Sequence, residues 1–337
     1  MTLYTMATSL REGCRSIGQK IRYGVGEISE HWREPYWWRL RFASRVAGPI
    51  LGTIHGNDGV DFMERDWDNL LILDACRADL FEEAIDTNQF DGYERVHSIG
   101  CSSPEWMRKT FEGRTFPDTV YVTANPWISK IASDSFHEIV NLWVEEGELS
   151  EREIKNADGA IEGVGVSGGV TIHPDTLSDV ARRVHEEYPD KRLIVHYFQP
   201  HAPIVGNPDG TRKDETQQGL HPGDDLKENN VTREEVWEGY LDNVQYAFYY
   251  AEQLADDLGG RSAITADHGE LFGEGLWPFP NRGYAHSDSV RHPKLTEVPW
   301  AVKEVGDRRE IVADELTHHE ADEDMIDDRL RDLGYKV

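Results

Sequence analysis

The chain has 337 residues, and 38% of them are apolar, which is enough for one large domain with a sizeable core. Its formal net charge is −28, from 63 acidic and 35 basic residues that are distributed along the sequence. Such a surface repels phosphate backbones and therefore argues against nucleic-acid binding. Distributed acidity with few lysines is typical of proteins from very salty cytoplasm, so we expect a halophilic cytoplasmic protein.

The three cysteines, Cys14, Cys76 and Cys101, lie far apart and show no CxxC or Cys/His spacing. This pattern predicts neither a disulfide framework nor a zinc site built on cysteine, and it fits a reducing compartment. No apolar run reaches the roughly 18 residues of a membrane-spanning helix, and residues 1–10 lack a signal-peptide pattern. We therefore expect a protein that is not secreted.

Residues 1–60 differ in charge from the rest of the chain. They contain eight basic and five acidic residues, a net charge of +3, which leaves −31 for the remainder. The stretch HWREPYWWRLRFASRVAGPILG interleaves aromatic side chains with arginine. This basic aromatic arm could lie peripherally at the inner membrane face, with Trp and Tyr at the headgroup level. The alternative, which we favour, is that the arm packs its tryptophans on the domain.

From Trp67 onward, strand-like apolar runs alternate with helical patterns, which predicts an α/β fold with a mostly parallel sheet and helices on both faces. The clearest strands are predicted at 69–75, 119–125, 192–198, 262–268 and 298–302. A helix is predicted at 175–189, and another at 232–258 begins with the capping box Thr232-x-x-Glu235 and ends at two glycines.

Two further segments complete the predicted organisation. Residues 204–231 are polar and rich in Gly, Pro and Asp, which predicts a lid-like insertion. The last residues, 323–337, predict a short amphipathic helix. We therefore expect a catalytic domain at 61–303 between the arm at 1–60 and an acidic C-terminal segment at 304–337.

Polar residues follow the ends of several predicted strands, where open α/β sheets bind their ligands. They are Asp74, Asn125, His201, Asp267 and His268. Two separate aspartates and a histidine suit a divalent cation, because carboxylate oxygen is a hard ligand and imidazole nitrogen a borderline one. Considered alone, Asp74 could instead cap the next helix, and the Asp-His pair could belong to a surface turn.

Three loops add candidates for catalysis. GCSSPEW (100–106) supplies serine hydroxyls, which become nucleophilic when a metal ion lowers their pKa. QPHAP (199–203) places a histidine where it can donate to an anionic oxygen or protonate a leaving group. GYAHSDS (283–289) presents His286, although the chain has 14 histidines and each of these loops could also lack chemistry.

In this order, NLLILDACRAD, CSSPEW, QPHAP, TADHGELFGEG, AHSDS and EVPWAV resemble the alkaline phosphatase superfamily, in particular its sulfatase-like hydrolase branch, over residues 67–303. The resemblance implies that Asp74, Asp267 and His268 bind one divalent cation. It also implies that this cation coordinates the nucleophile Ser102, with Ser103 as the fallback. The residues implied to bind the transferred oxyanion or the leaving group are Asn125, His201 and His286.

The chain also departs from this family. Formylglycine sulfatases have Cys-x-Pro-x-Arg, whereas Ser102 begins the corresponding Ser-Ser-Pro-Glu-Trp here, and Cys101 is one residue too far from Pro104 to replace it. Only one aspartate, Asp74, stands where calcium-type sulfatases often carry a pair. Gln199 stands where two-metal members have an aspartate for the second ion. These departures favour an unmodified serine and a single ion, Mn or Zn rather than Ca or Mg because of the histidine nitrogen.

We therefore expect a metal-dependent hydrolase or transferase of phosphate or sulfate esters, whether small molecules or esters linked to glycans or lipids. The alternative is a catalytically silent sulfatase-like protein that binds or scaffolds at a membrane surface. The basic aromatic arm and the altered Ser-x-Pro-x-Trp motif support this alternative. Bound metal in the purified protein would speak against it, as would indifference to liposomes.

Overall fold

The computed structural model describes residues 41–142, 171–213 and 230–314. It also describes residues 33, 38, 316, 326–327 and 330–331 and the course of several short elements between the main ranges. These are β5 (Val144–Glu145), β6 (Glu148–Leu149), β7 (Gly163–Val166), β8 (Gly169–Ile172) and α8 (Pro222–Glu228). Most of the predicted arm and of the predicted C-terminal helix lies outside the described residues.

A seven-stranded sheet forms the centre of the molecule, with the strand order β2-β13-β10-β1-β9-β3-β4. The bounds are β1 Asn69–Leu73, β2 Gly92–His97, β3 Phe116–Thr123, β4 Phe136–Asn141, β9 Arg192–Tyr197, β10 Gly260–Thr265 and β13 Glu297–Val305. The run β10-β1-β9-β3-β4 is parallel throughout, whereas β13 pairs antiparallel with both β10 and β2. The predicted α/β fold with a mostly parallel sheet is confirmed.

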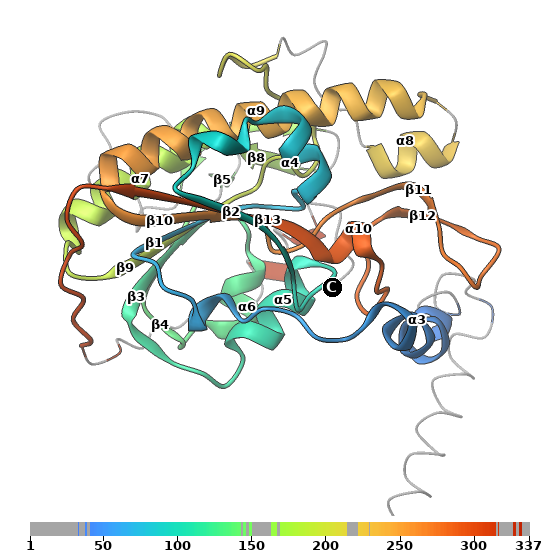
Figure 1. Ribbon diagram of the computed structural model, residues 1–337, viewed down its shortest axis with the longest axis horizontal. Coiled ribbons are helices and arrows are strands. Elements are labelled where there is room, and N and C mark those ends of the chain that lie inside the picture. The colour runs from blue at the N-terminus through green and yellow to red at the C-terminus, as the bar shows by residue number, and fades with distance from the viewer. Residues whose placement is uncertain are drawn as a thin grey trace, which may run out of the picture.

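Helices cover both faces of this sheet (Figure 1). One face carries α4 (Ala78–Ala84), α7 (Pro174–Glu187) and α9 (Arg233–Leu258), which contact one another, and the other carries α5 (Ser103–Phe111) and α6 (Trp127–Ala132). The predicted capping box at Thr232 is present, and α9 ends at Gly259, which has φ +64°. The strand between these layers, β1, is buried over its whole length, as its uninterrupted apolar run predicts.

The described part of the predicted lid is tied to the domain. The Asn243 side chain on α9 accepts hydrogen bonds from the backbone N–H groups of Val205 and Gly206 and donates to the carbonyl oxygen of Pro200. These bonds fix the start of the insertion directly after the loop that carries His201. Whether the insertion moves as a lid stays a prediction.

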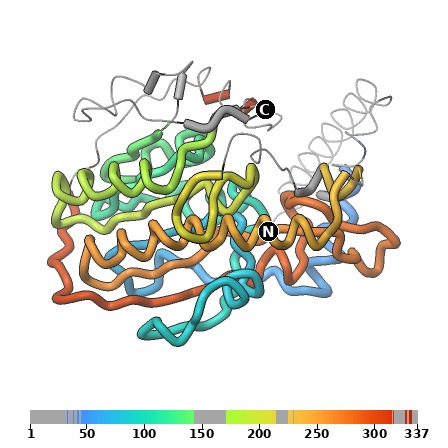
Figure 2. The backbone as a smooth tube through the Cα atoms, turned by 90° about the horizontal axis from the view of Figure 1, so that it is seen from above, coloured from blue at the N-terminus to red at the C-terminus, as the bar shows by residue number. Residues whose placement is uncertain are grey.

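A helix before the main domain lies beside a β-hairpin at one end of the molecule (Figures 1 and 2). The helix comprises a π-helical turn, η1 (Ala43–Ala47), followed by α3 (Gly48–His55), and the hairpin comprises β11 (Leu271–Gly275) and β12 (Arg282–Ala285). The remaining short helices are η2 (Phe62–Glu64), η3 (Thr87–Gln89) and α10 (Pro293–Thr296). None of the helices in the described part of the chain has the length and hydropathy needed to cross a bilayer.

Candidate metal centre

Two neighbouring parallel strands bring the predicted ligands together. Asp74 follows β1, and Asp267 and His268 follow β10, which pairs with β1. All three side chains are fully buried, and one ligand atom from each lies within 4.8 Å of the others. The Nε2 atom of His268 is 3.5 Å from an oxygen of each aspartate. We call Asp74, Asp267 and His268 the inner triad. Ligand atoms around a tetrahedral ion with bonds of about 2.1 Å are about 3.4 Å apart, so the inner triad has the dimensions of a cation site.

The polar atoms of the inner triad also fit a divalent cation. Asp74 Oδ1 and Asp267 Oδ2 are buried without a hydrogen-bond partner, a costly arrangement unless an ion binds there. Burial, and next the Asp267 carboxylate, raise the pKa of Asp74 well above its ordinary value. Carboxylate oxygens and an imidazole nitrogen together form a donor set that suits Mn or Zn.

Three residues with an unfavourable backbone conformation lie directly beside residues at or near the site. Among the described residues, the non-glycine positions with positive φ are Ala75 (φ 60°), Ala285 (φ 61°) and Ser289 (φ 66°). They are the immediate neighbours of Asp74, His286 and Asp288 in the chain, and such strain concentrates at functional sites.

Two contacts fix the turns after β1 and β10. The N–H of Ala75 donates to Asp267 Oδ1 at 3.2 Å, which joins the two strand ends. Gly269, directly after His268, has no room for a side chain, because a Cβ there would lie 2.1 Å from the carbonyl oxygen of Lys294. The backbone therefore orients the side chains of the inner triad before any ion is bound.

A serine hydroxyl contacts the inner triad. Ser103 Oγ lies 3.3 Å from Asp74 Oδ2 and 3.2 Å from His268 Nε2. Ser103 is the first residue of α5, so its hydroxyl also lies at the positive end of that helix. A nucleophile that a cation would activate is expected at such a position.

Ser102, the predicted nucleophile, has a different environment. Its hydroxyl caps α5 by accepting from the N–H of Glu105 and donates to Asp288, which also pairs with Arg108. The structure therefore brings the fallback serine, Ser103, against the inner triad, whereas the Ser102 hydroxyl bonds to Asp288 and to the N–H of Glu105. Coordination of Ser102 by a metal ion stays a prediction.

Asn125 and an unpredicted histidine also contact the aspartates. Asn125 Nδ2 donates to Asp74 Oδ2 at 3.1 Å. His196, in the middle of the sheet on β9, places Nε2 3.7 Å from one oxygen each of Asp74 and Asp267. Its other ring nitrogen is 2.8 Å from the Tyr121 hydroxyl, and burial lowers the pKa of His196 to about 4. A histidine inside the otherwise apolar run RLIVHYF is the sequence signal that could have identified it.

A second group of potential ligands borders the first, and we call it the outer cluster. It consists of His201, Glu270 and His286, whose ligand atoms also lie within 4.8 Å of one another. His286 Nδ1 is 2.9 Å from Glu270 Oε2, and the His286 ring lies 5.2 Å from that of His201 and 4.4 Å from that of His268. The outer cluster is thus in direct contact with the inner triad.

Glu270 was not predicted, although it belongs to the Asp-His-Gly-Glu run. Its Oε1 atom is buried without a partner, so the outer cluster offers one carboxylate and two imidazoles to a ligand.

The two histidines of the outer cluster differ in their pKa. Burial, and next the neighbouring His286, lower the pKa of His201 to about 4, so its ring is neutral at ordinary pH. Burial also lowers the pKa of His286, but the Glu270 carboxylate more than offsets this, and the net shift is upward. His286 is therefore the better proton donor of the two.

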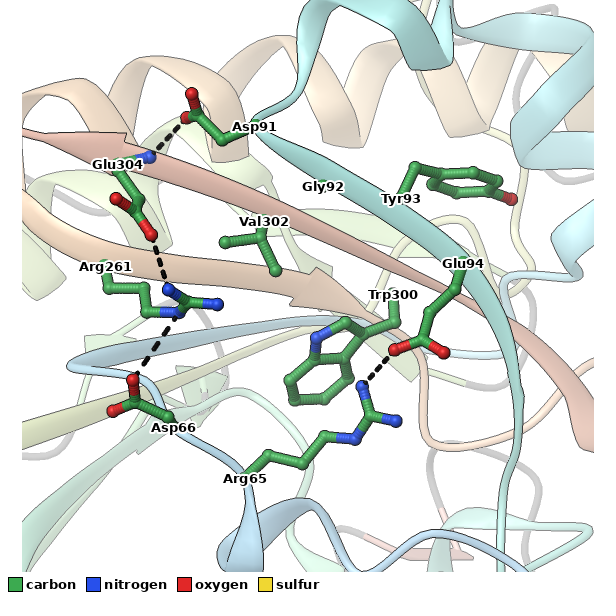
Figure 3. A pocket seen from close by; sticks show the side chains of 10 residues that line it. All are labelled: Arg65, Asp66, Asp91, Gly92, Tyr93, Glu94, Arg261, Trp300, Val302 and Glu304. Carbon is green, nitrogen blue, oxygen red and sulfur yellow. Dashed lines mark hydrogen bonds and ion pairs between the residues drawn. The ribbon is translucent and has the colours of Figure 1, made fainter.

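A polar hollow of about 400 Å³ lies against the edge strand β2 and its neighbour β13 (Figure 3). Its charged groups face one another: Arg65 pairs with Glu94 at 2.7 Å, and Arg261 pairs with Glu304. The Arg65 guanidinium also lies 4.5 Å from the centre of the Trp300 ring. Because these charges pair with one another and no candidate residue lines the hollow, it has no part in the site.

Fold and site together define an α/β protein with a candidate metal centre at the carboxyl ends of its parallel strands. No family model matches the chain, and neither does any curated protein. Similar solved structures include the C-terminal periplasmic domain of phosphoethanolamine transferase EptC from Campylobacter jejuni, with 14% identity and a TM-score of 0.44 over 69% of this chain and 77% of that one.

Two further structures have comparable likeness. The C-terminal periplasmic domain of EptC from Escherichia coli in complex with Zn has 12% identity and a TM-score of 0.40, over 74% of this chain and 76% of that one. The phosphonate monoester hydrolase of Agrobacterium radiobacter has 11% identity and a TM-score of 0.39, over 70% of this chain and 67% of that one. At these values the likeness carries no argument about activity.

Proposed function

We propose that this protein is a metal-dependent phosphoesterase or phosphotransferase whose nucleophile is Ser103. The observation that carries the proposal is the contact of Ser103 Oγ with a buried triad in which one oxygen of each aspartate lacks a partner. A buried network that served stability alone would satisfy its acidic oxygens, because unpaired polar groups are costly in the interior. A cation site beside an alcohol explains both features.

The chain supplies the parts of a covalent mechanism. A divalent cation held by Asp74, Asp267 and His268 would supply Lewis-acid activation of the Ser103 hydroxyl. The N-terminus of α5 stabilises negative charge on that oxygen, and Asn125 orients the Asp74 carboxylate by donating to it.

The outer cluster would act on the ester. His286 would bind an anionic oxygen of the ester, and Glu270 would keep the His286 ring protonated and oriented. His201, whose Nδ1–H donates to the carbonyl oxygen of Ala202 at 2.8 Å, would bring an acceptor nitrogen, Nε2, to the same site. In the first step Ser103 would lose its hydroxyl proton to water, the bond from its Oγ to phosphorus would form, the bond from phosphorus to the leaving alcohol would break, and His286 would give its proton to that alcohol. In the second step water or another alcohol would attack the phosphorus and give its proton to His286, and the released Ser103 oxygen would take a proton from water.

The identity of the serine favours phosphate over sulfate esters. Sulfatases of the formylglycine type need Cys-x-Pro-x-Arg, which this chain lacks. An unmodified alcohol suits phosphoryl transfer through positioning and charge stabilisation. Substrate screening must resolve whether the ester is a small molecule or is linked to a glycan or lipid.

The proposal is tested with metal-depleted protein in high-salt buffer. Mn, Zn, Mg or Ca is restored separately, and turnover of an aryl phosphate, an aryl phosphodiester and an aryl sulfate is measured. We expect phosphoester turnover that requires Mn or Zn and is lost in Ser103→Ala, with a phosphorylated Ser103 peptide after rapid acid quench. Turnover that persists in Ser103→Ala, or no turnover of any ester with any of these ions, would remove the proposal.

A further inference from the structure

The helix before the main domain presents large apolar side chains to solvent at every fourth position. Between 39% and 45% of the surface of each is exposed. The five residues are Trp38, Phe42, Val46, Ile50 and Ile54. The opposite side of the helix is buried through Ala47 and Leu51. A surface helix normally exposes polar residues on its outer face, so an apolar stripe of this length is unusual.

The neighbouring hairpin extends the same apolar surface. Its tip carries Trp277, the most exposed of the large apolar side chains in the described part of the chain, at 71%. Phe279 of the tip packs edge to face against Phe42 at 5.5 Å, which joins the hairpin to the helix. The two elements also line a hollow of about 350 Å³. We call the stripe and the hairpin tip together the apolar face.

The charge around the apolar face is opposite to that of the rest of the protein. Residues 35–57 contain three arginines, Arg39, Arg41 and Arg45, and no aspartate or glutamate, in a chain of net charge −28. Of these, Arg45 is exposed beside the stripe. Exposed tryptophan with arginine and without acids is the composition of segments that lie in the headgroup region of anionic membranes.

The apolar face is packed directly on the segments that carry the site. Ala47 and Leu51 form one cluster with Cys101, Leu271 and Val290. Cys101 immediately precedes Ser102, and Leu271 immediately follows Glu270. The helix behind the stripe therefore packs on segments that also carry residues of the candidate site.

We propose that the apolar face docks the protein on the surface of an anionic lipid bilayer. Two protruding elements with exposed tryptophans suit insertion into the headgroup region, where apolar burial and attraction between arginine and lipid charge add together. A second copy of the chain fits less well, because pairing two such faces would bring the two sets of arginines together. This inference is independent of the proposed enzymatic function.

The test is co-flotation of the full chain with vesicles of phosphatidylglycerol or of phosphatidylcholine. We expect flotation with phosphatidylglycerol that exceeds flotation with phosphatidylcholine and weakens as salt screens the arginines. The double variant Ile50→Gln/Trp277→Gln should lower partitioning into phosphatidylglycerol vesicles by at least about tenfold. Arg45→Glu should lower it less and should reduce the preference for anionic lipid.

Tyr249→Gln is the matched control, because Tyr249 is 43% exposed on α9 and lies outside the apolar face. It should float like the wild type, and circular dichroism should show that all variants are folded. Three results would overturn the proposal: wild type that does not float with phosphatidylglycerol, a double variant that floats like wild type, or a wild-type dimer in sedimentation that the double variant loses.

Discussion

The inner triad and the outer cluster are adjacent, but the fold holds them in different ways. The inner triad lies at the ends of the paired strands β1 and β10 and is fully buried. The outer cluster lies on loops after β9, β10 and β12; its Glu270 is buried, and the His286 side chain keeps 10% of its surface exposed. Acids at the ends of paired strands suit a permanent cation, whereas loop histidines that keep some access to solvent suit a substrate that enters and leaves. This difference predicts separable effects of mutation on metal binding and on turnover.

The largest expected effect comes from the inner triad. Asp267→Asn should remove the bound metal and lower kcat/KM by at least about a thousandfold, because the alcohol loses its activation. Elemental analysis and kinetics measure the two effects. The matched change in the outer cluster, His201→Asn, should keep the metal of the inner triad while it lowers turnover. Equal loss of metal in both variants would show that the two groups form one site.

A smaller effect is expected from Glu270, whose carboxylate raises the pKa of His286. Glu270→Gln removes this support, so His286 should lose its proton at a lower pH. Because the protonated ring is the proposed acid, the alkaline limb of the pH–rate profile should move to lower pH, and turnover near neutral pH should fall by about 10- to 100-fold. Glu270→Asp should restore part of the shift. An unmoved limb would exclude His286 as the acid.

The stability of the metal-free protein tests whether the buried Asp74 carboxylate is destabilising in the absence of a cation. The pKa of Asp74 is raised in the folded state, so the folded protein binds a proton that the unfolded chain releases. Stability is therefore expected to fall as the pH rises through the folded pKa of Asp74. In chelator at neutral pH, Asp74→Asn should melt several degrees above wild type, and added Mn or Zn should reverse this order. A lower melting temperature for the variant in chelator would contradict the assignment.

The sequence predicted the parts of the fold that are buried and continuous. β1 is an apolar run after Asn69, β9 is an apolar run that only His196 interrupts after Arg192, and the capping box at Thr232 marked the start of α9. The edge strands β2 and β4 were missed because their exposed or half-buried positions carry charged and polar residues, as in GYERVH. The family resemblance stays a prediction, since no family model matches the chain.

The inner triad was predictable because each member sits at a strand end that the sequence marks. Glu270 was not, because it joins His286 only through the β11–β12 hairpin, 16 residues away in the chain. Likewise, the choice between adjacent serines depends on where α5 begins. If α5 began one residue later, Ser103 would be the helix cap and Ser102 would no longer be. The position of Pro104 in the sequence does not by itself fix this boundary.

The smallest effect is expected from Ser102, and its neighbour Ser103 provides the contrast. Ser102→Ala removes the cap of α5 and its bond to Asp288, which should cost about 1 kcal/mol of stability while kcat changes by less than about tenfold. Ser103→Ala should do the opposite, with little change in melting temperature and no turnover, because its hydroxyl contacts the inner triad. Thermal melting and kinetics of the two variants side by side decide the assignment. If Ser102→Ala abolishes turnover and Ser103→Ala does not, the helix boundary rather than the chemistry is wrong, and the nucleophile is Ser102.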